Sequence, residues 1–205
     1  MMQRVPLLPP PPPSPYSMAM PVIPEARRYT VQEVLEFPDD GNRYEVVQGE
    51  LLVSPAPRNR HQLLMGRLLF DLYQYLEAVG IRDGVRMAPA DITWGEDPGI
   101  AEDLVQPDLF VPDPSQLLGE WIGMTRLELA VEVLSPSSLR ADRVVKRRTY
   151  QRHGVKTYWV IDDDAKLVEV WRPGDERPEI VTEALTWRIR EDAPELRMPL
   201  AELLR

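Results

Sequence analysis

Two acidic residues of this chain lie in apolar segments, where a carboxylate is difficult to explain as a surface group. Glu132 lies in the run Leu-Ala-Val-Glu-Val-Leu-Ser of residues 129–135, and Asp108 follows Pro107 in an equally apolar run. Burying an unpaired carboxylate costs several kcal/mol or forces it to take up a proton. Two carboxylates at neighbouring strand ends suit Mg²⁺, which prefers oxygen ligands. We therefore predict a Mg²⁺ site at Asp108 and Glu132, the alternative being that each pairs with a basic side chain.

A polar stripe is expected on the helix that follows the Glu132 strand. Asp142, Lys146, Tyr150 and His153 are spaced so that they share one helix face. A tight turn should return this helix to the strand, so Lys146 could hold a nucleophilic water or stabilise transition-state charge. The alternative is that these residues belong to a solvated surface of the helix.

The same helix carries a concentration of positive charge. The chain as a whole has a net charge of −9, so any binding of nucleic acid must depend on a local basic patch. Residues 140–156 contain a single acidic residue, Asp142, and seven basic ones: Arg140, Arg143, Lys146, Arg147, Arg148, Arg152 and Lys156. Such residues contact phosphates independently of base sequence. A solvated helix face without a partner is the alternative.

The chain contains only two histidines, His61 and His153, too far apart in sequence to form a strong zinc pattern. His61 lies at the start of a long helical segment, where it could act as an acid–base group or contact a phosphate, or make only a structural hydrogen bond. His153 near a helix end needs no further role. The Asp162–Asp164 run lacks the spacing of a calcium loop and is expected to form a hairpin turn.

The helices and strands that must position these residues are predicted from the spacing of apolar residues and from the residues that cap or end each segment. Helices are expected at 30–37, 59–79, 139–153 and 200–204, the first opened by the capping box of Thr30 and Glu33. Strands are expected at 43–47, 51–53, 85–93, 103–111, 127–134, 157–161 and 167–171. This order predicts an α/β fold with a mixed sheet and helices packed on it.

Composition limits the possible location of the protein and its division into domains. Cysteine is absent, which excludes disulfides and a cysteine nucleophile and fits a reducing, cytoplasmic location. No apolar run approaches the length of a transmembrane helix, so no membrane partner is expected. We predict one domain over residues 25–205. Residues 1–24 contain nine prolines and are expected to form a disordered tail, or a docking segment for an SH3-like partner.

Several of these motifs together resemble the Uma-two type of restriction endonuclease, a branch of the PD-(D/E)XK nuclease superfamily. The matching features, in order over roughly residues 28–172, are RYEVVQGEL, His61 after SPAPRNR, VQPDLFV, VEVLSPSS, Lys146 with Tyr150, and GVKTYWVID. The resemblance implies a restriction-endonuclease-like αβββαβ core, binding of Mg²⁺ or Mn²⁺, and hydrolysis of DNA phosphodiesters. Asp108, Glu132 and the carbonyl of Val133 would then bind the metal.

One position departs from the superfamily pattern. The catalytic lysine should lie two residues after Glu132, but that position is Leu134. Some branches supply the lysine from the following helix, and Lys146 is the candidate here. The resemblance also matches Glu45 to an acid that adds a ligand or orients a water, and leaves His61 and Tyr150 as accessory residues.

Three functions are compatible with the sequence. The first is a Mg²⁺-dependent endodeoxyribonuclease, expected to be a homodimer because one active site cuts one strand. The second is a catalytically weak or inactive module that keeps the fold and binds nucleic acid or a protein, since fold alone does not establish activity. The third is a structural protein whose acidic surface binds basic partners.

Overall fold

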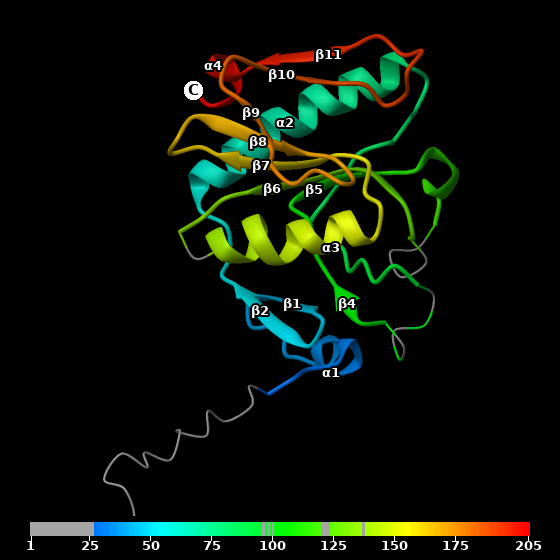
Figure 1. The fold of residues 1–205 in the computed structure, drawn as a ribbon, viewed down its shortest axis with the longest axis vertical. Helices are drawn as coiled ribbons and strands as arrows, with labels where there is room; N and C mark the ends of the chain where they lie inside the picture. Colours follow the sequence, from blue (N-terminus) through cyan, green and yellow to red (C-terminus); the bar gives the residue numbers. More distant parts are fainter. Residues whose placement is uncertain (1–26, 96, 98, 100, 120–123, 137) are drawn as a thin grey trace, which may run out of the picture.

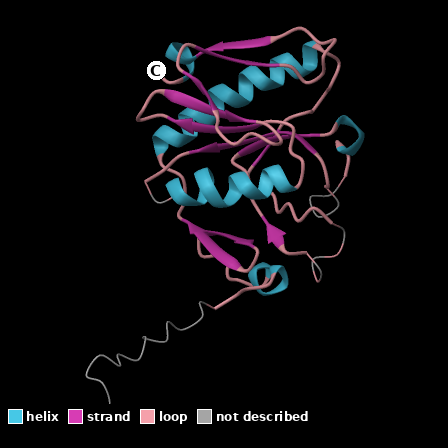
Figure 2. Cartoon of the chain, in the orientation of Figure 1, coloured by secondary structure: helices cyan, strands magenta, loops and turns pink. Residues whose placement is uncertain are grey.

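A six-stranded mixed sheet with a helix on each face forms the centre of the computed structural model, which describes residues 27–95, 97, 99, 101–119, 124–136 and 138–205 (Figures 1 and 2). The strand order is β3-β5-β6-β7-β8-β9. The bounds are Arg86–Met87, Leu109–Pro112, Leu127–Val133, Tyr158–Asp162, Leu167–Trp171 and Glu179–Val181 respectively. The predicted α/β class with a mixed sheet is confirmed. The predicted tail lies outside the described residues, and no described helix has the length and apolar character needed to span a bilayer.

Strand β6 lies in the middle of the sheet, and all seven of its residues are buried. It pairs antiparallel with β5 and parallel with β7, and a parallel pair requires a crossover connection. The predicted helix supplies that crossover. Its first part, Ala141–Lys146, is a π-helical segment, and it continues as α3, Arg147–Arg152. The π-helical segment was not predicted.

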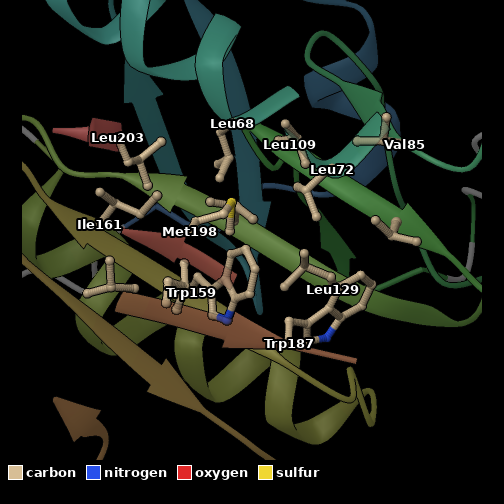
Figure 3. Packing of buried hydrophobic residues seen from close by; sticks show 14 of the residues in the cluster. Leu68, Leu72, Val85, Leu109, Leu129, Trp159, Ile161, Trp187, Met198 and Leu203 are labelled. Carbon is tan, nitrogen blue, oxygen red and sulfur yellow. The ribbon is translucent and has the colours of Figure 1, made fainter. Parts of the chain in front are cut away.

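Alternation along β6 divides the interior into two layers. Leu129 and Val131 point to the layer covered by α2, Asn59–Ala78, where Leu68 and Leu72 pack against the sheet (Figure 3). Ala130 points to the opposite layer, which contains Tyr150 from α3. Because side chains alternate across a strand, Glu132 lies on this second side, under α3.

A smaller sheet packs below the main one (Figure 1). It has the order β2-β1-β4, with bounds Glu50–Ser54, Arg43–Val47 and Asp103–Leu104. The predicted hairpin of β1 and β2 is confirmed, and its two turn residues, Gln48 and Gly49, both have positive φ, as a type I′ turn requires. The predicted capping box opens α1, Val31–Leu35, which packs on this sheet.

Two predicted strands are shorter than expected. The strand expected over residues 103–111 divides into β4 and β5, which belong to different sheets. The division falls around Pro107, which has no N–H to donate to a ladder. The strand expected over residues 85–93 is reduced to β3 and an isolated bridge between Ile92 and Val105.

The C-terminal part forms a hairpin and a short helix over the α2 side of the sheet (Figure 1). The hairpin strands are β10, Ala184–Trp187, and β11, Leu196–Pro199, and the helix is α4, Leu200–Leu203. A 3₁₀ turn, Pro114–Gln116, follows β5. The hairpin was not predicted, whereas the terminal helix was.

Three cations hold the end of α4 against the rest of the fold. Arg60 and Arg67 of α2 and Lys166 donate hydrogen bonds to backbone carbonyls of residues 203–205. Arg60 and Lys166 also pair with Asp163, at 2.6 and 2.8 Å. Asp163 therefore organises the cations that anchor α4.

Asp163→Asn should reduce the free energy of unfolding at neutral pH by about 1 kcal/mol, an ion-pair value discounted because Arg60 and Lys166 are half-exposed. The hydrogen bond from Arg60, together with Lys166, lowers the pKa of Asp163 to about 2. An unfolded Asp titrates near 3.9, so this stabilisation is present above about pH 4 and is lost as the pH falls towards 2. Urea unfolding from pH 3 to 7 should show the two proteins converging in acid. Asp164→Asn, at the exposed neighbouring position, should show no such difference.

Candidate active site

A pocket of about 550 Å³ opens where β6 ends, between the start of α2 and the helix that follows β6. Six acidic residues line it, and three of them, Asp108, Glu132 and Asp142, lie at its inner end with Arg43 and His61 nearby. All three carboxylates are buried. The predicted pair Asp108 and Glu132 therefore belongs to one cavity.

The pairing of β5 with β6 explains why these two carboxylates meet. Leu109 is opposite Val131 in the antiparallel ladder, so the next pair along is Asp108 opposite Glu132. The backbone N–H of Val133 donates a hydrogen bond to Asp108 Oδ2, at 2.9 Å. The Asp108 side chain is thus fixed to the strand that carries Glu132.

Asp108 is held by two further groups on its other side. Arg43 Nη1 lies 2.7 Å from Oδ1, and His61 Nε2 lies 3.0 Å from Oδ2. Burial alone would raise the pKa of Asp108, but the hydrogen bond from His61 and the charge of Arg43 outweigh it and hold that pKa well below its usual range. The carboxylate is ionised and can only accept, so Nε2 of His61 must carry a proton.

Lys146 lies at the centre of a second group of site residues, which surrounds Glu132. Its Nζ is 3.0 Å from Glu132 Oε1, 2.9 Å from Glu45 Oε2 and 3.5 Å from Asp142 Oδ1. Only 2% of Lys146 is exposed. The hydroxyl of Tyr150 also donates to Glu132 Oε1, at 2.9 Å. Lys146, Tyr150 and Asp142 of the predicted stripe therefore face the buried carboxylates rather than solvent.

Glu45 comes from β1 of the smaller sheet and connects it to the site. It is fully buried, and its Oε1 accepts a hydrogen bond from the backbone N–H of Gln106, at 2.7 Å. Gln106 lies two residues before Asp108. Glu45 therefore fixes both the Asp108 segment and the ammonium group of Lys146.

The charges of the site do not balance. Within the described part of the chain, the carboxylates of Glu45, Asp108, Glu132 and Asp142 contact only two permanent cations, Arg43 and Lys146. Burial raises the pKa of Glu132 and of Asp142, because one ammonium group cannot compensate several neighbouring acids. The same carboxylates raise the pKa of Lys146 despite its burial. The site thus combines a buried, positively charged lysine with surplus negative charge.

The basic patch is largely paired with acids from other elements. Arg140 pairs with Glu50, Arg152 with Asp103, and Arg143 with Asp162 and Glu169. Arg147 stacks on Trp171 and donates to Gln151. Arg148 is exposed, and its guanidinium group pairs with no acid among the described residues.

His153, the other histidine, lies away from the pocket. Its ring stacks on Trp94 with a centroid distance of 4.2 Å, and its Nε2 is 2.7 Å from Asp103. This contact joins the end of α3 to β4, as the structural interpretation of His153 expects. The Asp162–Asp164 run lies where β7 turns into β8, which confirms the predicted hairpin.

Two site residues received no role from the sequence. Arg43 begins β1, and nothing in its neighbourhood signals a partner 65 residues away. Asp142 was visible as part of the helical stripe, but its burial beside Lys146 was not predicted. Among the described residues, no three acidic or histidine side chains already stand in a ligand arrangement. The ammonium group of Lys146 contacts Glu45, Glu132 and Asp142 instead.

The fold is that of an α/β protein with a mixed sheet between two helical layers. A solved structure from Anabaena variabilis ATCC 29413, described as "a putative nuclease belonging to DUF820", matches with a TM-score of 0.70 and 22% identity. The match covers 86% of this chain and 97% of that chain. At this identity the likeness defines the fold.

The family is identified by its sequence model. Residues 31–201 match the Uma2 family, described as "Putative restriction endonuclease". The chain belongs to this family, and the resemblance drawn from the motifs is confirmed. No curated protein matches the chain.

Proposed function

We propose that this protein is a metal-dependent endonuclease that hydrolyses DNA phosphodiester bonds. The observation that carries the proposal is that Asp108 and Glu132 line one pocket while Lys146, from the helix after β6 rather than from position 134, pairs with Glu132 behind the pocket wall. This combination supplies ionised and protonatable carboxylates beside a fixed positive charge. Phosphodiester hydrolysis requires both, because negative charge develops on the phosphate.

The donor set fits a hard divalent cation such as Mg²⁺ or Mn²⁺. Carboxylate oxygens are the preferred ligands of these ions, and the four buried carboxylates of the site carry more negative charge than the two permanent cations they contact can neutralise. Asp108, Glu132 and the carbonyl of Val133 would hold the ion, with Asp142 as a further carboxylate on the pocket wall. A bound divalent ion supplies Lewis-acid stabilisation and a lowered pKa for a coordinated water.

The other side chains position the reacting groups. Lys146 stabilises charge on the phosphate or orients the attacking water, and Tyr150 and Glu45 hold Glu132 and Lys146 in place. His61 orients Asp108 through Nε2, while its Nδ1 is buried and has no hydrogen-bond partner among the described residues. Arg43 keeps Asp108 ionised.

The DNA backbone would follow the helix after β6. Arg148 is the side chain best placed to contact phosphates, since it is exposed and no acid of the described chain holds it. Arg140, Arg143, Arg147 and Arg152 would contribute after exchanging their present partners for phosphate. Cleavage of both strands would then use two copies of the chain, acting in the cytoplasm as a homodimer.

A second function is supported by Leu134. Its apolar side chain occupies the position of the usual lysine, which favours a module that binds nucleic acid or a protein without cutting. The two functions differ in one result: a binding module would retain DNA in a salt-dependent manner but would leave it intact with Mg²⁺ or Mn²⁺.

Cleavage of supercoiled plasmid tests the proposal. With Mg²⁺ or Mn²⁺ the protein should nick and linearise the plasmid, and a chelator should stop the reaction. Glu132→Gln should abolish cleavage while leaving DNA binding intact. The matched control is Glu128→Gln, which changes another buried glutamate of β6 that pairs with Lys156 outside the pocket. Equal cleavage by the two variants would overturn the assigned site.

A further inference from the structure

The outer face of α2 carries large apolar side chains that nothing in the described chain covers. Leu63, Phe70 and Tyr73 are 51%, 60% and 45% exposed. Gly66 lies on the same face, and a Cβ added there would meet no atom within 4 Å. The opposite face of α2 is buried against the sheet. An exposed patch of this kind on a folded protein usually marks an interaction site.

We infer that a second copy of this chain covers this face, through antiparallel pairing of the two α2 helices. This inference deepens the proposed homodimer by giving it an interface. Leu63, Gly66, Phe70 and Tyr73 follow one another at spacings of three, four and three residues, the pattern of a helix–helix seam. A stripe with this spacing can pair with its own copy around a twofold axis.

The side chains are complementary in size when they pair in this way. We place the twofold axis at the level of residue 68 along the two antiparallel helices. Phe70 then faces the partner's Gly66, and Leu63 faces the partner's Tyr73. Each contact occurs twice because of the symmetry. The large ring of Phe70 therefore fills the open space over Gly66, and the absent side chain of Gly66 allows the two helices to approach closely.

The charges at the two ends of the stripe are complementary as well. Arg58 lies at the start of α2 and Glu77 near its end, and neither side chain has an ion-pair partner among the described residues. In the same register Arg58 lies beside the partner's Glu77. Two such pairs flank the apolar contacts, which favours a second copy over an unrelated apolar partner. Arg58 also lines the pocket, so the interface adjoins each active site.

Sedimentation analysis of the full chain should show a dimer, and Phe70→Glu should convert it to a monomer whose circular dichroism spectrum is unchanged. The matched control is Ile180→Glu on β9, since Ile180 is 53% exposed and lies on another element; it should remain dimeric. A monomeric wild-type protein, or a Phe70→Glu protein that stays dimeric, would overturn the inference.

Cross-linking tests the register, and the absence of cysteine from the chain removes any background. A mixture of Leu63→Cys and Tyr73→Cys proteins should be joined by a short bis-maleimide. Either variant alone should react far less, because two copies of the same position would be separated by about 15 Å along the helices. Equal cross-linking of Leu63→Cys with Val53→Cys would rule out this pairing. These readouts do not use cleavage, so an inactive wild-type protein would refute the proposed function and leave the interface test intact.

Discussion

Lys146→Met should lower the turnover of DNA cleavage by roughly 10²–10³-fold, the usual scale for losing one transition-state donor. Lys146 is buried among Glu45, Glu132 and Asp142, so it cannot serve as a surface contact to the DNA backbone. The affinity for DNA should therefore change little. Single-turnover cleavage at saturating DNA measures the effect, and a melting curve checks that the variant folds without the buried ammonium group.

Arg148→Met is the informative comparison for that experiment. Arg148 lies two residues further along the same helix but is exposed, so its loss should weaken DNA binding and reduce the salt dependence by about one phosphate contact. Cleavage of bound DNA should continue. If Lys146→Met and Arg148→Met cut saturating DNA at the same near-wild-type rate, Lys146 does not act on the reacting phosphate.

Asp108→Asn should reduce the affinity for Mn²⁺ by at least about 100-fold. The pocket holds Asp108 ionised through His61, Arg43 and the N–H of Val133, so the substitution removes a full charge from the ion's site. A loss of about 3 kcal/mol corresponds to that factor, and it lies within the range for two charges about 4 Å apart in a protein. Calorimetric titration of Mn²⁺ measures the affinity directly.

Thermal unfolding gives a second measure of the same prediction. Mn²⁺ should raise the melting temperature of the wild-type protein, and Asp108→Asn should lose most of that gain. The comparison uses the gain and not the absolute melting temperature, because Arg43 and His61 lose their anionic partner in the variant. Asp192→Asn, on the exposed surface, should keep the full gain. Equal gains in both variants would place the ion elsewhere.

The sequence was most informative where local pattern and tertiary packing agree. The apolar run of β6 predicts a central strand, and a carboxylate within such a run requires an explanation, which singles out Glu132. The spacing of Asp142, Lys146 and Tyr150 is enough by itself to place the three side chains on one helix face. These inferences use only periodicity and the cost of burying charge, both of which depend on nearby residues.

The parts that could not be predicted depend on residues distant in sequence. The run of arginines suggested free positive charge, but its partners Glu50, Asp103, Asp162 and Glu169 come from four other strands or turns. Arg43 meets Asp108 only because the smaller sheet docks beside the main one. The division of the strand at Pro107 also depends on that docking, since each half finds a different neighbour.

The π-helical segment at Ala141–Lys146 makes the site sensitive to the number of residues in this part of the chain. Such a segment closes its hydrogen bonds over five residues instead of four and so holds one residue more than an α-helical turn. Removing one residue between Asp142 and Lys146 would turn these two side chains about 100° relative to one another. The core beneath the helix would tolerate that rotation better than the site would. A change of length at this point is therefore expected to alter the chemistry of the site before it alters the fold.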